Sequence, residues 1–387
     1  MKRTRHQNGY VYRKGGNWMV RFYDTQELPG GMIKRVQKAH KLVEAAGDYK
    51  TKAAARVLAA EYLAPLNDGR TTPQSVMSLQ SFVEKYYLPF VETHKRVSTY
   101  HGYRNLWKGT LKAHGAIALR DFRTTDGERI LGAVARENDL TSTTLRHLKA
   151  FLSGVFRYAK RQGVINSENP VRDVVLPKAR PAEDTYAYSL EEITQMLDVL
   201  PEPAATIVAA ASFTGARKGE LRGLRWQDYN GEEVRVSQSF WRSHLQEPKT
   251  RKSRAPVPVI SQLAEWLNQH RELMGNPAKG LMFQSPAGKP INLDALAHDV
   301  IRPALQKAEI QWHGWHAFRR GLATNLHRLG VADETIQRIL RHSTVAVTQN
   351  CYIKTADADA VAAMRSLENA PNMHLGSPKR PKVMYQN

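Results

Sequence analysis

The stretch FTGARKGELRGLRW, residues 213–226, predicts a tight turn followed at once by a helix. Gly215 suits the turn, and Arg217 would stand at the start of the helix. A guanidinium in that place adds to the positive end of the helix dipole, so both attract an anion. Glu220 follows one turn later and could hold the arginine, although surface ion pairs at this spacing are common. The stretch therefore indicates a binding site for an anionic group.

A second stretch, WHAFRRGLATNLHRLG at residues 315–330, also predicts a helix with cationic residues on one face. His316 and Arg319 are one helical turn apart and therefore lie side by side. Arginine can bind two phosphoryl oxygens, while histidine can donate to a third oxygen or move a proton. An ordinary surface helix could carry the same residues, so the pair matters only together with the others.

Lysine and arginine also cluster in EPKTRKSRAP, residues 247–256. The runs on either side are rich in strand-forming residues, so these cations are expected at the tip of a β-hairpin. A cationic tip suits contact with a DNA groove or backbone. The candidates are Lys249, Arg251 and Lys252, and nothing local decides which one donates a proton.

The only cysteine stands beside a tyrosine in RHSTVAVTQNCYIKT, residues 341–355. A thiol is usually the better nucleophile at neutral pH, so Cys351 competes with Tyr352 for a chemical role. Neighbours on a helix point about 100° apart, so only one of the two can face a shared pocket. The upstream cations, including His342, suit a phosphate. We therefore interpret Tyr352 as the attacking oxygen and Cys351 as a packing residue.

These candidates describe one kind of chemistry when they are combined. Two arginines and two histidines could stabilise the charge of a pentacoordinate phosphorane, and a lysine could protonate the leaving oxygen. A phenol with a pKa of about 10 needs such a cationic pocket to lose its proton on attack. In chain order the set is Arg217, Lys249, His316, Arg319, His342 and Tyr352.

Composition favours a polyanionic partner and excludes several other classes of protein. The 387 residues include 57 Lys and Arg against 36 Asp and Glu, a net charge of +21. Such an excess suits nucleic acid, because bound phosphates release their counterions. A solubilising surface or a ribosome-associated protein would also explain it. No P-loop, zinc pattern, secretory signal or membrane span is present, so no metal, cofactor or membrane is expected.

The clearest helix in the middle of the chain is TTLRHLKAFLSGVFRYAKRQG, residues 143–163. Leucine and valine form an apolar stripe along it, and Gly163 ends it. Its other faces carry basic residues with no acid among them, which favours phosphate contact over a merely solvated surface. The basic residues proposed for DNA binding here are Arg146, Lys149, Arg157 and Lys160, together with Arg251 and Lys252 of the expected hairpin tip.

The order and spacing of these motifs resemble the tyrosine recombinase (phage integrase) family over about half of the chain. TGARKGEL resembles the T-G-x-R-x-x-E-L box of that family, HAFRRGLAT its H-x-L-R-[RH]-x-x-A-T box, and LRHSTVAVTQNCY its L-G-H…Y box. Phe318 replaces the leucine of the second box. Arg341 stands where the family commonly has glycine, and it could shift His342 or add a phosphate contact.

The resemblance implies the roles of the site residues. Tyr352 would form a 3′-phosphotyrosine link, and Glu220 would take the supporting acidic position. The KT…SR…VPV pattern favours Lys249 over Lys252 as the general acid. The residues implied to assemble around the scissile phosphate are Arg217, Lys249, His316, Arg319 and His342.

The resemblance also implies a multidomain, mainly α fold with small β-sheets. An arm-type DNA-binding domain with a three-stranded sheet and one helix is expected at residues 1–70. A helical, SAM-like core-binding domain is expected at 75–180, and an α+β catalytic domain at 184–370. Residues 371–387 are expected to form a basic, disordered tail.

The implied activity is site-specific DNA recombination without metal or ATP, which would integrate or excise a phage or mobile element. The implied partners are double-stranded attachment sites, further copies in a homotetramer on DNA, and a directionality factor, in the cytoplasm and nucleoid of a bacterial host. A type IB topoisomerase shares the chemistry, but two DNA-binding segments before the catalytic one favour recombination. A carboxylate-triad integrase would need Mg²⁺. An inert DNA-binding protein would be expected to have lost one of the six catalytic positions, and none is lost.

Overall fold

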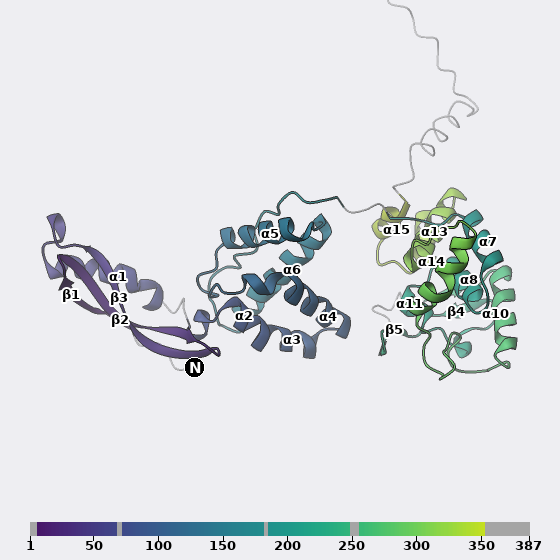
Figure 1. Cartoon of the computed structure of the whole chain (residues 1–387), viewed down its shortest axis with the longest axis horizontal. Coiled ribbons are helices and arrows are strands. Elements are labelled where there is room, and N and C mark those ends of the chain that lie inside the picture. Colours follow the sequence, from purple (N-terminus) through teal and green to yellow (C-terminus); the bar gives the residue numbers. More distant parts are fainter. Residues whose placement is uncertain (1–5, 68–71, 182–184, 248–254, 353–387) are drawn as a thin grey trace, which may run out of the picture. The chain divides into compact units, whose positions relative to one another are not determined.

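The computed structural model describes residues 6–67, 72–181, 185–247 and 255–352, with side chains as far as residue 349. The chain divides into two compact units, Met1–Glu183 and Asp184–Asn387. The first contains a sheet and a helical bundle, and the second is mainly helical (Figure 1). In the described ranges, no helix is long and apolar enough to cross a bilayer.

The first unit begins with an antiparallel sheet of β1 (Tyr10–Lys14), β2 (Asn17–Leu28) and β3 (Met32–Glu44), in that order. Gly15 and Gly16 form the first turn, with φ values of 53° and 75° that residues with a side chain rarely adopt. Alternate residues of β2 face one side, so Val20 and Phe22 pack on α1 (Lys52–Asn67). The predicted sheet and helix are confirmed.

The remainder of the first unit is a bundle with α2 (Leu79–Phe82), α3 (Leu88–His94), α4 (Val97–Leu106), α5 (Thr124–Asn138) and α6 (Ser142–Arg161). Thr141 caps α6 by accepting a hydrogen bond from the backbone of Thr144, and Gly163 follows its end with a φ of 69°. The predicted apolar stripe is the buried face of this helix and includes Leu145, Leu148, Leu152 and Val155.

The second unit is built around α8 (Ala204–Thr214), which is buried along almost its whole length. A helix made of small and apolar residues has no polar face, so other helices must cover it. Three of them, α7, α10 and α13, pack against it. The helices of this unit are α7 (Leu190–Val199), α8, α9 (Lys218–Leu221), α10 (Ser261–Leu273), α11 (Leu293–Leu296), α12 (Arg302–Lys307), α13 (Trp315–Arg328), α14 (Asp333–Leu340) and α15 (Val345–Tyr352).

The strands of the second unit include one hairpin more than the sequence predicts. They are β4 (Glu233–Arg235), β5 (Ser239–Trp241), β6 (His244–Gln246) and β7 (Pro256–Pro258). β4 pairs antiparallel with β7, so the two predicted runs do pair, but β5 and β6 form a further hairpin between them that the sequence did not reveal. The chain turns earlier, at Arg242, whose φ of 54° is uncommon for arginine and therefore gives no signal in the sequence.

Candidate active site

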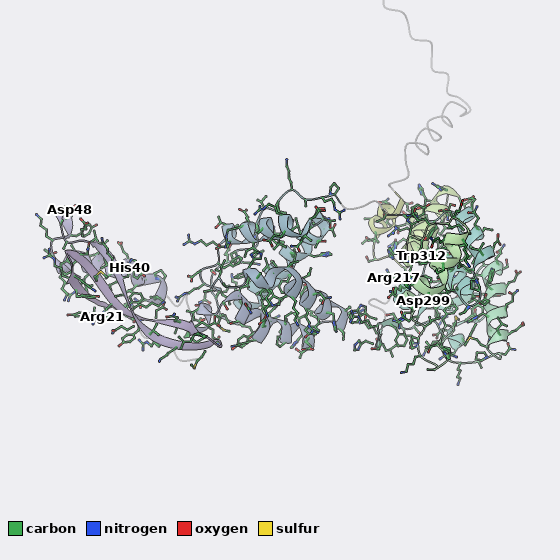
Figure 2. The ribbon with its side chains drawn as sticks, viewed as in Figure 1. Arg21, His40, Asp48, Arg217, Asp299 and Trp312 are labelled. Atoms are coloured by element: carbon green, nitrogen blue, oxygen red, sulfur yellow. The ribbon has the colours of Figure 1, made fainter. Side chains whose placement is uncertain are left out.

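The turn before Arg217 sets that residue at the start of α9. Gly215 ends α8 with a left-handed φ of 58°, and a Cβ added there would lie 2.5 Å from Cδ2 of Leu340 in α14. Glycine is therefore required for both backbone and space. Arg217 emerges from the turn with 42% of its side chain exposed, and Figure 2 labels it in the second unit. This exposed guanidinium is the part of the site that an anion can reach.

Glu220 holds Arg217 with both carboxylate oxygens. Oε1 accepts a hydrogen bond from Arg217 Nη1 (2.8 Å), and Oε2 accepts one from the Arg217 backbone N–H (3.0 Å). Nη2 of Arg341 donates to the same Oε2 (2.9 Å). Burial acts to raise the pKa of Glu220, but Arg341 and Arg217 outweigh it and lower that pKa below its ordinary value. Glu220 is therefore a carboxylate at neutral pH.

Arg319 is the buried cation of the site, with 1% of its surface exposed. Its Nη1 donates to the carbonyl of Gly215 at 2.5 Å, and its Nη2 donates to the carbonyl of Leu340. Its Nε donates to Nε2 of His342 at 3.2 Å. These bonds join α13 to the ends of α8 and α14, so Arg319 positions two of the helix ends that form the site.

His342 is held as a neutral imidazole with one defined tautomer. Arginine can only donate, so Nε2 of His342 must be the unprotonated ring nitrogen. Nδ1 then carries the proton and donates to Oγ1 of Thr348 in α15 (2.8 Å). Burial and the nearby charges of Arg319 and Arg217 lower the pKa of His342 to about 3. Both ring nitrogens are thus occupied, and the ring links α13 to α15.

His316 lies one turn before Arg319 on α13, as the sequence predicted, and its side chain reaches solvent. Partial burial and the charges of Arg320, Arg319 and Arg217 lower its pKa to about 4. The ring is therefore neutral at physiological pH and can accept a proton. Because it is exposed, His316 is better placed than the enclosed His342 to exchange a proton with a bound substrate.

Arg341 does not displace His342. It ends α14 with a left-handed φ of 57°, and its buried side chain turns to Glu220. His342 keeps its bonds to Arg319 and Thr348. These bonds give no sign of the shift of His342 that the sequence left open, and the buried side chain of Arg341 is not placed to add a phosphate contact. Sequence reasoning did not foresee the Arg341–Glu220 pair, although an arginine in a glycine position was the signal that pointed to it.

The nucleophile candidate lies at the end of α15, which packs against α13 and α14. Tyr352 is the last residue of that helix. The structure describes its backbone but not its side chain. Lys249, Arg251 and Lys252 also lie outside the described residues. The structure thus brings together Arg217, Glu220, His316, Arg319, His342 and the helix that carries Tyr352.

The basic residues proposed on α6 differ in their surroundings. Lys149 donates its Nζ to the carbonyl of Val174 (2.7 Å), and Arg146 donates to Oγ1 of Thr143 (2.9 Å). Arg157 and Lys160 are exposed. Lys149 therefore has a structural partner, whereas the last two cations face solvent and are available to a polyanion.

A second basic surface, not foreseen residue by residue, covers one face of the N-terminal sheet. The guanidinium of Arg21 lies 5.0 Å from the ring of Tyr12, and that of Arg35 lies 4.7 Å from the ring of Tyr23. Both pairs lie away from the α1 side of the sheet, and Figure 2 labels Arg21 there. Residues two apart on a strand share a face, so this alternation could have revealed the surface.

Metal-binding residues do not cluster within the part of the chain that the structure describes. No group of three or more His, Cys, Asp or Glu side chains could hold an ion there. His313, the other histidine of the HGWH stretch, stacks on Tyr186 with ring centres 3.6 Å apart.

Comparisons with known proteins find similar sequences and similar folds. Residues 185–359 match the model of the phage integrase family. The chain is 24% identical over 356 residues to a "Tyrosine recombinase XerC-like" protein of Caldanaerobacter subterraneus subsp. tengcongensis, covering 83% of this chain and 90% of that one. Its fold resembles the Tn1549 transposon integrase in complex with transposon right end DNA (TM-score 0.62, 19% identity, 76% and 100% coverage). Its fold also resembles a chain from the structure of a lambda integrase tetramer bound to a Holliday junction (TM-score 0.56, 17% identity, 90% and 96% coverage).

Proposed function

Because this chain belongs to the tyrosine recombinase (phage integrase) family and is a tyrosine-type site-specific recombinase, we propose that it integrates or excises a phage or other mobile element. The observation that carries the proposal is the convergence of Arg217, His316, Arg319 and His342 beside α15, the helix that ends at Tyr352. Neutral histidines among guanidinium groups suit an anion that must react with an oxygen nucleophile.

In the proposed first step, the phenol oxygen of Tyr352 attacks a DNA phosphate. A bond forms between phosphorus and the tyrosine oxygen, and the bond to the 5′-oxygen breaks. The neutral imidazole of His316 receives the phenol proton, and Lys249 gives a proton to the departing 5′-oxygen. Arg217, which is exposed, would contact the phosphorane, and the buried charge of Arg319 would add to the positive potential around it.

In the second step, the 5′-hydroxyl of a partner strand attacks the 3′-phosphotyrosine. Lys249, which lost its proton in the first step, takes the proton of that hydroxyl. The tyrosine leaves, and His316 returns its proton to the phenol oxygen. Each step exchanges one phosphoester bond for another, so the bond energy is retained and no nucleotide cofactor is needed. The cations of the site can neutralise the phosphate without a metal.

The same proposal assigns DNA contacts to the rest of the chain. Residues 1–70 would bind arm-type sites, residues 75–180 would bind core sites, and residues 184–370 would carry the chemistry. Two core sites with two protomers each would form a tetramer, as described for the lambda integrase on a Holliday junction. The partners would be attachment sites in double-stranded DNA and a directionality factor, in the cytoplasm and nucleoid of a bacterial host.

The proposed function is tested with nicked duplexes of random core sequence. A nick beside the cleavage position lets a short fragment diffuse away, so the covalent intermediate is trapped. We expect the full chain to form a denaturant-resistant complex with DNA, whose sequencing identifies the core site. Tyr352→Phe should form none, and EDTA should leave the yield unchanged.

Two outcomes would contradict the proposal. Covalent attachment by Tyr352→Phe would exclude this tyrosine as the nucleophile, and loss of the complex in EDTA would require a metal. Relaxation of plasmids that lack the selected site, at the same rate as plasmids that carry it, would indicate a topoisomerase instead of a site-specific recombinase.

A further inference from the structure

We propose that Arg341 is a positioning residue of this site, which acts on Arg217 through Glu220. The inference rests on the proposed function and deepens it. Arg341 holds Glu220 in place, and Glu220 holds Arg217 in the geometry that receives the phosphate. Arg341 itself does not touch the substrate, because its side chain has no exposed surface.

The geometry of the three side chains supports a relay. Glu220 directs Oε1 to the guanidinium of Arg217 at 2.8 Å, and Oε2 to the guanidinium of Arg341 at 2.9 Å. The carboxylate thus bridges an exposed arginine and a buried one. A carboxylate held at both oxygens has one orientation, so the direction of the Arg217 fork is fixed from behind.

The surroundings of Arg341 are unfavourable for a residue with only a capping role. It adopts the left-handed backbone conformation that favours glycine. Its Nε and Nη1 are buried and have no hydrogen-bond partner among the described residues. A glycine would end α14 without either disadvantage, as Gly215 ends α8. The bond to Glu220 is the interaction that offsets them, which points to the charge of Arg341 as its role.

A bound phosphodiester would make this charge necessary. Its negative charge at Arg217 opposes the neighbouring carboxylate of Glu220, and protonation of Glu220 would release the arginine fork. The charged groups that face Glu220 are Arg217 at the start of α9 and Arg341 at the end of α14. The elements that pack most extensively on α9 are α8 and β5, and neither contains an ionisable residue. Arg341 is therefore the counter-charge that keeps Glu220 ionised when Arg217 binds DNA.

The test measures single-turnover cleavage against pH with the full chain and the nicked duplex selected by covalent attachment to the wild type. Arg341→Gly should fold, because glycine suits the left-handed position, and a thermal melt checks this. We expect cleavage at pH 7 to slow on the order of 10- to 100-fold, the loss that a misplaced binding group can cause. The acid limb of the pH profile should also move to higher pH, because Glu220 loses one of its two cations.

Arg341→Lys is the matched variant, since an ammonium can still pair with Glu220 at a single point. It should recover part of the rate and return the acid limb toward that of the wild type. In a Glu220→Gln background, Arg341→Gly should cause little further loss, because the relay is already broken.

Three outcomes would overturn the inference. A folded Arg341→Gly with wild-type rate and pH profile would remove any positioning role. Equal losses in the Gly and Lys variants with an unchanged pH profile would indicate packing alone. Full additivity with Glu220→Gln would show that Arg341 does not act through Glu220. If the wild type itself formed no covalent complex with any duplex, the proposed function would fail first, which is a distinct result.

Discussion

Arg120 binds Asp24 with two hydrogen bonds, across 96 residues of sequence. Nη1 lies 2.9 Å from Oδ1, and Nη2 lies 2.7 Å from Oδ2, which Lys38 also contacts at 3.0 Å. Burial acts to raise the pKa of Asp24, but the bonds to Arg120 and Lys38 lower it to about 2. The pair joins the β2–β3 hairpin to the helical bundle of the first unit.

We predict that Asp24→Asn destabilises this junction by about 2 kcal/mol at neutral pH, the value of a pKa lowered from 3.8 to about 2. Asp24 is protonated near pH 3.8 in the unfolded chain, but only near pH 2 in the folded chain. The stabilisation is therefore complete above pH 3.8 and is lost as the pH falls toward 2. Hydrogen–deuterium exchange of β2 and β3 in the full chain measures the effect.

Asp121→Asn is the matched control for that variant. Asp121 also lies beside Arg120, with its Oδ1 3.8 Å from Nε, but 67% of its side chain is exposed. An exposed ion pair contributes little to stability. The free energy of opening that hydrogen exchange reports should therefore change by less than about 1 kcal/mol. Equal effects of the two substitutions would mean that the Asp24–Arg120 bonds do not hold the hairpin.

A second prediction concerns Gly215→Ala. The new Cβ would lie 2.5 Å from Leu340, and alanine would have to adopt a φ of 58°. Strain of this kind costs about 1–3 kcal/mol before the contact is relieved, so thermal melting of the second unit should shift clearly downward. Cleavage by the surviving folded protein should also fall, because the turn that carries Arg217 must move.

Gly330→Ala is the control, since its φ is also left-handed, at 77°, but its Cβ would meet nothing within 4 Å. An equal decrease in melting temperature in both variants would show that the close contact with Leu340 does not contribute to the effect.

Much of the fold could be predicted because local chemistry and tertiary packing agree. Ser189 and Glu192 stand at the spacing that is typical of a capping box, and they form one with bonds of 2.8 Å and 3.2 Å. The apolar stripe of α6 is the buried face of its bundle. The predicted fold class is accordingly confirmed, and residues 185–359 match the model of the family that the motifs resemble.

The remainder depends on backbone conformations and distant contacts that local patterns do not encode. Arg242 turns the chain with a positive φ and so makes a β5–β6 hairpin that the sequence did not reveal, between the two runs that were expected to pair. Arg341 uses another positive φ to reach Glu220, which lies 121 residues away. The partner of Lys149, a backbone carbonyl 25 residues away, likewise has no local signal.

A third prediction concerns the acid stability of the second unit. His342 has a pKa of about 3 when folded and an ordinary value of 6.5. The unfolded chain therefore binds a proton between these values and the folded chain does not. The contribution of His342 to the free energy of unfolding is therefore fully present above pH 6.5. It decreases as the pH falls toward 3, by up to about 1.4 kcal/mol per pH unit. His342→Gln should make the free energy of unfolding, measured by urea denaturation, less dependent on pH.

His298→Gln is the control. It removes a histidine with 79% of its side chain exposed and should leave that pH dependence unchanged. A slope that persists in His342→Gln would assign the acid lability to other groups.

A fourth prediction separates the cations of α6 into two kinds. Arg157 and Lys160 are exposed, so Arg157→Gln and Lys160→Gln should each weaken binding to a core-site duplex without changing the melting temperature. A lost phosphate contact should also reduce the slope of log Kd against log salt by about 0.9.

Lys149→Gln should behave in the opposite way. Lys149 donates to the carbonyl of Val174, so its loss leaves an acceptor unpaired and should lower stability by about 1 kcal/mol. The salt slope should stay that of the wild type, because this ammonium is already engaged within the protein. Fluorescence anisotropy at several salt concentrations, together with thermal melts, distinguishes the two behaviours. A reduced salt slope in Lys149→Gln would show that this lysine leaves Val174 to contact DNA, whereas unchanged slopes in the other two variants would place the DNA on a different face of α6.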